Sequence, residues 1–168
     1  MKPDSIFIIQ PRFEILSQKR LIGLRKAMSL SVNTTGELWG EFMRRRKEIR
    51  NYIGQDLYAV QVYDDAYFDK FNPENQFVKW ASIEVSNFDN VPDGMDTMTL
   101  PRGQYAVFAH RGCASAGRKT FQYIFETWLP GADYSLDHRP HFEILGERYK
   151  HEDPASEEEV WIPVKTRR

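Results

Sequence analysis

A carboxylate and an indole lie two residues apart in the segment 157–165 (EEEVWIPVK). Side chains of a β-strand alternate between two faces, so Glu159 and Trp161 share one face and the apolar residues take the other. We expect the apolar face to pack on helices. A carboxylate beside an indole can hold an organic cation through charge and through the ring face. The pattern favours Glu159 as a ligand anchor, and the alternative is that Glu157, Glu158 and Glu159 form a solvated entry to the strand.

Aromatic side chains make up 14% of the sequence, more than a core of this size requires. Flat rings bury a large area at small entropic cost, so they make good walls for planar ligands, although core packing is the alternative for each ring. Trp80 shares its strand face with Ser82 and Glu84, a mixed face that argues against a sealed core. The candidate wall residues are Trp39, Tyr58, Trp80, Tyr105, Phe142 and Tyr149, and Trp161 is a further candidate ligand-binding residue beside Glu159.

A second carboxylate, Glu143, lies in the predicted strand 141–149. It shares a face with His141, while Phe142 and Ile144 take the opposite face. Alternation alone does not decide which of the two sets lines a ligand site. Glu143 is therefore a candidate ligand-binding residue.

Two further groups could take part in catalysis. If the chain is an enzyme, we expect Glu159 to act as general acid or base, with an aromatic hydroxyl such as that of Tyr105 or Tyr149 assisting. Cys113 precedes a predicted helix, where a thiolate can be reactive. No Asn or Asp partner accompanies it, so a small buried hydrophobe is the favoured interpretation.

The sequence indicates neither a metal nor a cofactor. His138 and His141 have an H-x-x-H spacing, but Pro140 intervenes and the segment leads into a strand, which places them on opposite faces. No cysteine pair or carboxylate cluster completes a metal site. A glycine-rich phosphate loop and a Ser-His-Asp pattern are also missing.

The charge balance argues against direct nucleic-acid binding. Lys and Arg number 23 against 24 Asp and Glu, for a net charge of −1. Such a chain lacks the broad basic surface that nucleic-acid binders use. The basic run 44–47 is interleaved with acidic residues, including Glu41 four positions before Arg45, and is best explained as a solvated helix face.

We expect a cytoplasmic protein that does not contact membranes. The early apolar run 6–9 is too short for a signal peptide or a membrane span. A single cysteine fits a reducing compartment.

The hydrophobic pattern predicts two helices and a series of strands. One helix is expected over 37–53, ended by Gly54, and another over 118–129, ended by Pro130 and Gly131. The expected strands are 13–28, 57–63, 77–85, 98–110 (broken at 101–103), 141–149 and 157–165.

The element order is strand, helix, strand, strand, given twice. We therefore expect an α+β fold in one domain over 1–168, with tandem halves at about 12–87 and 97–166 related by a pseudo-twofold axis. Two such halves place antiparallel sheets side by side with both helices on one face. The opposite, concave face is then free to form a ligand cleft between the halves.

Three motifs resemble those of the GyrI-like small-molecule-binding domain family, which includes gyrase-inhibitor-like proteins and the effector-binding half of some AraC-type regulators. The segment 100–108 (LPRGQYAVF) resembles its P-x-G-x-Y-A-V-F strand, 140–145 (PHFEIL) its P-x-F-E-x-Y strand, and 159–164 (EVWIPV) its closing strand. The resemblance covers about residues 12–166. Leu145 departs from it, because many relatives carry Tyr at that position, and this could alter a pocket wall.

The resemblance implies a tandem fold whose pocket between the halves is aromatic and carries a carboxylate that meets cationic ligands. It implies a stand-alone member without a DNA-binding domain. We expect a small-molecule-binding protein for aromatic, hydrophobic, often cationic compounds. The alternatives are a hydrolase of cyclopropane-bearing or electrophilic natural products, using the same cleft, and a protein that modulates DNA gyrase or partners a regulator.

Overall fold

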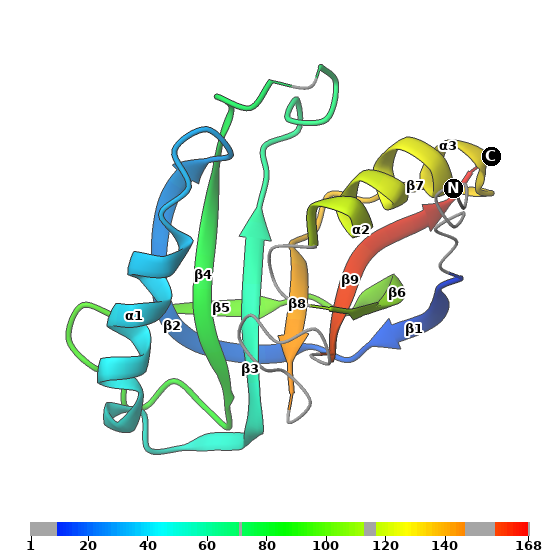
Figure 1. The fold of residues 1–168 in the computed structure, drawn as a ribbon. Coiled ribbons are helices and arrows are strands. Elements are labelled where there is room, and N and C mark those ends of the chain that lie inside the picture. The colour runs from blue at the N-terminus through cyan, green and yellow to red at the C-terminus, as the bar shows by residue number, and fades with distance from the viewer. Residues whose placement is uncertain (1–9, 71, 113–116, 147–156, 168) are drawn as a thin grey trace.

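The computed structural model of the chain describes residues 10–70, 72–112, 117–146 and 157–167 (Figure 1). Its strands are β1 (Arg12–Leu16), β2 (Lys19–Ser29), β3 (Tyr52–Val62), β4 (Gln76–Val85), β5 (Asp96–Leu100), β6 (Gly103–Arg111), β7 (Tyr134–Leu136), β8 (His141–Leu145) and β9 (Glu157–Thr166). Its helical segments are α1 (Thr35–Arg45), the 3-10 turn η1 (Arg46–Glu48), α2 (Gly117–Tyr123), the π-helical turn η3 (Ile124–Trp128) and α3 (Leu129–Gly131).

The strands form one antiparallel sheet in the order β1-β6-β9-β8-β3-β4-β2-β5, with β7 beside β9. β3 and β8 pair at its centre, where Ala59 lies opposite Glu143. The first half contributes β2, β3 and β4, and the second contributes β6, β8 and β9, so the predicted antiparallel sheet with helices is confirmed. Figure 1 shows that the sheet is strongly curled, like half a barrel.

Two long bent ribbons of chain cross between the halves. β1 continues almost directly into β2, and β5 into β6. Leu16 pairs with Gly103 and Lys19 with Leu100, so β1 pairs with β6 and β2 with β5 in one unbroken register. With the halves bounded as the sequence predicts, β1 of the first half therefore pairs with a strand of the second half, and β5 of the second half pairs with a strand of the first.

The helices cover the outer strands of one sheet face. Leu38 and Phe42 of α1 are buried against β2 and β4, and Ile124 of η3 is buried against β6 and β9, where Val160 and Ile162 lie. The prediction that the apolar side of 157–165 packs on a helix is thus confirmed. β3 and β8 run between α1 and α2 (Figure 1).

The first predicted helix is too long. α1 ends at Arg45 and a single 3-10 turn follows, whereas the sequence pattern extends the helix to residue 53. Ile49 is buried, but in an extended backbone conformation. Ile53 belongs to β3, and Gly54 takes its positive φ of 70° inside that strand, where the pairing with β4 is irregular. The apolar residues at helical spacing therefore continue beyond the end of the helix, and this is why the sequence pattern predicts too long a helix.

The second half differs from prediction in smaller ways. The helix expected over 118–129 is present as the continuous run α2, η3 and α3. β7, which the sequence pattern misses, adds three residues beside β9. The described part of the strand predicted for 141–149 ends at Leu145. None of the helical segments among the described residues has the length and apolar character needed to cross a bilayer.

Candidate ligand-binding site

Glu159 lies on the sheet face opposite the helices, as alternation predicts. Arg12 donates from Nη2 to Glu159 Oε2 at 2.6 Å, and the Trp161 indole donates from Nε1 to Oε1 at 3.2 Å. The Arg12 guanidinium also lies 5.9 Å from the Trp161 ring centroid. The carboxylate and the indole do form a cation site, and an arginine of the chain itself occupies it. The role of Glu159 as a ligand anchor stays a prediction.

The structure brings most of the predicted wall residues together on this face, but packs them against one another. Phe142 stacks on Trp161 at 5.2 Å and contacts Tyr105 at 5.2 Å and Tyr58 at 5.9 Å between ring centroids. The prediction that Trp80 lies on an unsealed face is wrong, because the curl of the sheet leaves it only 5% exposed. These rings form a buried core, and their ligand role stays a prediction.

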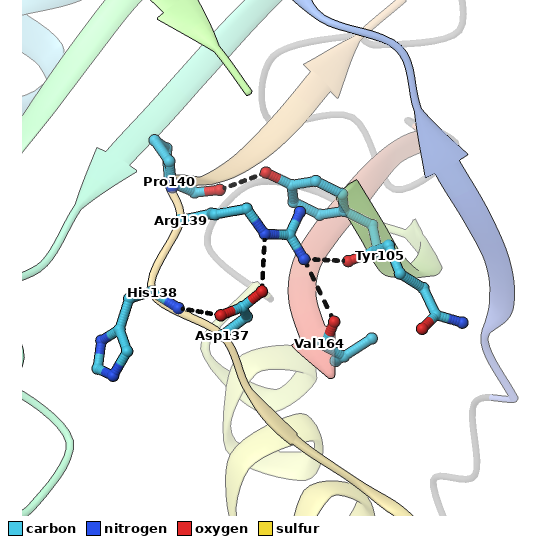
Figure 2. Close-up of polar contacts among 7 residues, drawn as sticks. Tyr105, Asp137, His138, Arg139, Pro140 and Val164 are labelled. Atoms are coloured by element: carbon cyan, nitrogen blue, oxygen red, sulfur yellow. Dashed lines mark hydrogen bonds and ion pairs between the residues drawn. The ribbon is translucent and has the colours of Figure 1, made fainter. Parts of the chain in front are cut away.

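Tyr105 is fully buried and its hydroxyl is already engaged (Figure 2). The hydroxyl donates to the Pro140 carbonyl at 2.9 Å, and the Arg139 guanidinium lies 4.7 Å from the ring centroid. Arg139 in turn donates to Asp137, to the Gln104 carbonyl and to the Val164 carbonyl (Figure 2). Burial raises the pKa of Tyr105 to about 12. This network ties the segment before β8 to β6 and β9.

The remaining sequence candidates lie elsewhere. Trp39 is on α1, where its ring meets Phe42 edge-on at 5.6 Å in the helix-side core of the first half. Tyr149 and Cys113 lie outside the described residues. His138 forms an ion pair with Asp65 at 3.1 Å.

The helix-side face between the two halves carries a pair of carboxyl groups. His141 and Glu143 point to this face, while Phe142 and Ile144 point to the other. Which of the two sets lines a ligand site stays a prediction. Gln61 of β3 donates from its side chain to Glu143 Oε1 at 3.2 Å. Glu158 of β9 lies on the same face and interacts with the Glu143 carboxyl. It is half-buried, so the alternative of a solvated strand entry does not describe Glu158.

The environment of this pair favours the protonated form. Burial, together with the charge and hydrogen bond of Glu143, raises the pKa of Glu158 to about 8, and the Lys79 ammonium only partly opposes this. When two carboxyl groups lie close together in a low-dielectric environment, ionisation of one disfavours ionisation of the other. At neutral pH this environment therefore favours the protonated form of Glu158.

Aromatic rings from both halves lie around His141, two residues before Glu143 on the same sheet face. His141 meets Tyr63 edge-on at 4.9 Å and stacks with Phe68 at 5.4 Å, and Phe68 stacks on Phe125 at 5.0 Å. Burial and the charge of Arg139 lower the pKa of His141 to about 3, so its ring is neutral. We call this group the seam cluster; it comprises Gln61, Tyr63, Phe68, Phe125, His141, Glu143 and Glu158.

Two open hollows lie away from the seam cluster. One, of about 490 Å³, lies between α1 and β2 and is lined by charged side chains such as Lys26 and Glu37, which pair with each other at 2.8 Å. The other, of about 640 Å³, lies beside β7. Neither is lined by an aromatic side chain. Among the described residues, no group of three or more His, Cys, Asp or Glu side chains converges as metal ligands would.

Sequence reasoning missed most of the seam cluster. Alternation does place Glu158 on the face of Val160, and that face was expected to be sealed by helices. The helices cover only the outer strands, so the central strands β3 and β8 are covered by rings such as Phe68 from the β3–β4 connection. The available signal was the pair of acidic residues, Glu143 and Glu158, that alternation puts on a mainly apolar face.

The curled antiparallel sheet with two helices on one face is the fold of a class of small-molecule-binding domains. The chain belongs to the GyrI-like family: the profile described as "GyrI-like small molecule binding domain" matches residues 9–165. The chain is 27% identical over 146 residues to the transcriptional regulator BrlR of Pseudomonas aeruginosa. That match covers 86% of this chain and 51% of BrlR, so the chain spans about half the length of this relative.

Solved structures show the same fold. The structure of SAV2435 bound to tetraphenylphosphonium superposes with a TM-score of 0.69 at 14% identity, covering 93% of this chain and 94% of that one. The C-terminal domain of EcmrR superposes with a TM-score of 0.72 at 14% identity, covering 96% and 100%.

Proposed function

We propose that this chain binds aromatic, hydrophobic cations at the seam cluster, with the Glu143–Glu158 pair as the anionic anchor. The observation that carries the proposal is the placement of two carboxyl groups, Glu143 and Glu158, together on one partly buried sheet face, next to aromatic rings that contact His141. An approaching organic cation favours the ionised form of Glu158, so the bound cation replaces a proton as the neutralising charge. The surrounding rings of Tyr63, Phe68 and Phe125 supply apolar surface and ring faces for such a ligand.

The choice of face rests on a comparison of two carboxylates. Glu159 already has Arg12 as its counter-ion, and a ligand cation would have to displace a tethered guanidinium. Glu158 has another carboxyl group as its closest partner. Family membership supports small-molecule binding, and the ligand named for SAV2435 is a lipophilic cation. The sequence-based proposal that Glu159 is the anchor competes with this one.

The test is calorimetric titration near pH 8 with tetraphenylphosphonium and with tetraphenylborate, an anion of nearly the same shape. We expect wild type to bind the cation and not the anion. Glu158→Gln should weaken cation binding by about tenfold or more, because it removes the ionisable partner of a charge-assisted contact. Glu159→Gln is the matched control, because it makes the same change one residue away, and should alter affinity by about twofold or less.

Two results would contradict the proposal. Loss of binding in Glu159→Gln with unchanged binding in Glu158→Gln would move the anchor to the other sheet face. Equal binding of both ions, or of neither, by the folded protein would reject a cation-selective site.

A second candidate function is hydrolysis at the same place. A carboxylic acid with a pKa near 8 holds its proton at neutral pH, as a general acid must. Incubation with a cyclopropane-bearing compound, followed by mass spectrometry, would reveal addition of one water. Turnover that is lost in Glu158→Gln would support the hydrolase, and quantitative recovery of the unchanged compound would reject it for that substrate.

Two further expectations remain proposals. A role as a partner of DNA gyrase or of a separate regulator would use a surface other than the seam cluster, so filling the seam with ligand should leave that binding unchanged. An origin of the two halves by internal duplication is supported by the sheet order, which reads as the same arrangement from both ends.

A further inference from the structure

The strand β1 forms one end of the sheet. Among the described residues it pairs with β6 alone, so its other backbone edge has no strand beside it. Figure 1 shows β1 at the right-hand margin of the molecule. A free edge with unpaired N–H and C=O groups is a template for a further strand.

β1 is only partly protected as an edge. Natural edge strands are commonly short or charged, or blocked by proline or a bulge; the segment Arg12–Leu16 (RFEIL) is short and carries two charges of opposite sign, but it has no proline, lysine or bulge. Its register with β6 is regular over all five residues. Phe13 and Ile15, on the helix-side face, are 41% and 65% exposed. Phe13 also stacks on Tyr134 at 4.6 Å, which fixes the exposed ring in place.

The charges of β1 are complementary to β1 itself. In an antiparallel pair of two β1 strands centred on Phe13, Arg12 of each copy lies opposite Glu14 of the other. The pairing thus creates two cross-strand ion pairs on one face and brings the two Phe13 rings together on the other. Arg12 already donates from Nε to Glu14 of its own chain at 3.0 Å and from Nη2 to Glu159. Its guanidinium has five N–H groups, so it can bind the second Glu14 as well.

Other registers are worse. Centring on Glu14 or on Arg12 places like charges directly opposite each other, which is destabilising. A shift by a single residue turns the second sheet over and sets Phe13 against Glu14. We propose that β1 pairs antiparallel with β1 of a second copy of this chain, through a twofold axis at Phe13, so that two sheets join into one.

The expected association is concentration-dependent. A pair centred on Phe13 overlaps only residues 12–14 of the two β1 strands and places Ile15 opposite Pro11. Such a pair buries less area than a standard stable interface of about 1,600 Å², so the dimer should be weak. Twofold symmetry makes the interface self-complementary, because each contact occurs twice. This inference is independent of what the seam cluster binds.

The test uses charge reversal and analytical ultracentrifugation of the full chain over a range of protein concentrations. Wild type should shift from monomer to dimer as concentration rises. Arg12→Glu and Glu14→Arg should each weaken the dimer by about tenfold or more, because each places like charges opposite one another. A one-to-one mixture of the two variants should form a heterodimer, and the double variant R12E/E14R should recover the homodimer.

The variants also contain their own controls. Melting temperatures establish that each is folded. Glu159→Gln removes one intramolecular partner of Arg12 and leaves the other, Glu14, in place, so it should leave dimerisation unchanged. Ile15→Lys, on the opposite face of β1, should weaken the dimer independently of Arg12. A wild type that stays monomeric at the highest concentration would overturn the proposal, as would a mixture of the two variants that associates no better than either alone.

Discussion

Glu158 and Glu159 are neighbours on β9, and the molecule neutralises them in opposite ways. Glu159 is neutralised by a cation from the chain, Arg12, above a core of packed rings. Glu158 has the Glu143 carboxyl beside it, and this group together with burial raises the pKa of Glu158 and favours its protonated form. Under our proposal a ligand cation can replace that proton, whereas at Glu159 it would have to displace Arg12, which is part of the chain.

The largest expected effect is a difference in stability between variants that remove a ring from each of the two sheet faces. Phe142→Ala should lower the free energy of unfolding by about 3–5 kcal/mol, because it leaves a cavity among fully buried rings. Thermal denaturation should show a fall in melting temperature of about 10 °C. Phe68→Ala, in the seam cluster, is the matched control and should cost far less, because Phe68 is 39% exposed. Similar losses for both variants would mean that the seam rings are core as well.

The next effect is the pH dependence of cation binding. Glu158 is protonated below its pKa of about 8, and cation binding requires the ionised form. As pH rises toward that pKa, the affinity for tetraphenylphosphonium should therefore increase by about tenfold per pH unit, and above the pKa it should level off. Calorimetry in buffers of different ionisation enthalpy measures the proton that is released. Binding that does not change between pH 6 and 8 would contradict the role of the pair.

Stability should follow the opposite trend in the free protein. The pKa of Glu158 is raised on folding, so the folded state keeps a proton that the unfolded chain releases. The contribution of Glu158 to the free energy of unfolding is then highest below the ordinary Glu pKa of about 4.5 and declines as pH rises toward 8. Glu158→Gln should flatten this part of the profile.

The smallest effect concerns Arg12→Gln. The Arg12–Glu159 pair is substantially exposed, so its loss should change the free energy of unfolding by only about 0–1 kcal/mol. The variant frees Glu159 and the Trp161 ring face, and calorimetry then tests whether a second cation site opens. A second site in this variant and not in wild type would show that Arg12 occupies a latent site, whereas a large loss of stability would show that Arg12 is mainly structural.

The sequence predicted the fold better than the site. Strand alternation placed Val160 and Ile162 against helices and put Glu159 with Trp161, and all of this is confirmed. Alternation cannot give the curl of a sheet, and the curl is what turned Trp80 and Phe142 from open walls into a core.

The seam cluster could not be predicted because it depends on tertiary placement. Phe68 belongs to a polar, Asp-rich connection, and nothing local indicates that its ring reaches His141 and Phe125 of the other half. The sequence pattern also does not predict where the helices lie relative to the central strands. The predicted end of the helix at residue 53 was wrong for a related reason, because Ile49 is buried by tertiary packing without being helical.

The exchange of β1 and β5 between the halves has a consequence for how the chain reaches its native state. Strands that lie some 75 to 95 residues apart in sequence must meet before either half has its full complement of neighbours. Such long-range pairing makes for slow folding. A chain cut between β4 and β5 would yield two fragments that each expose an unpaired strand, and these fragments should regain native structure only when they are mixed.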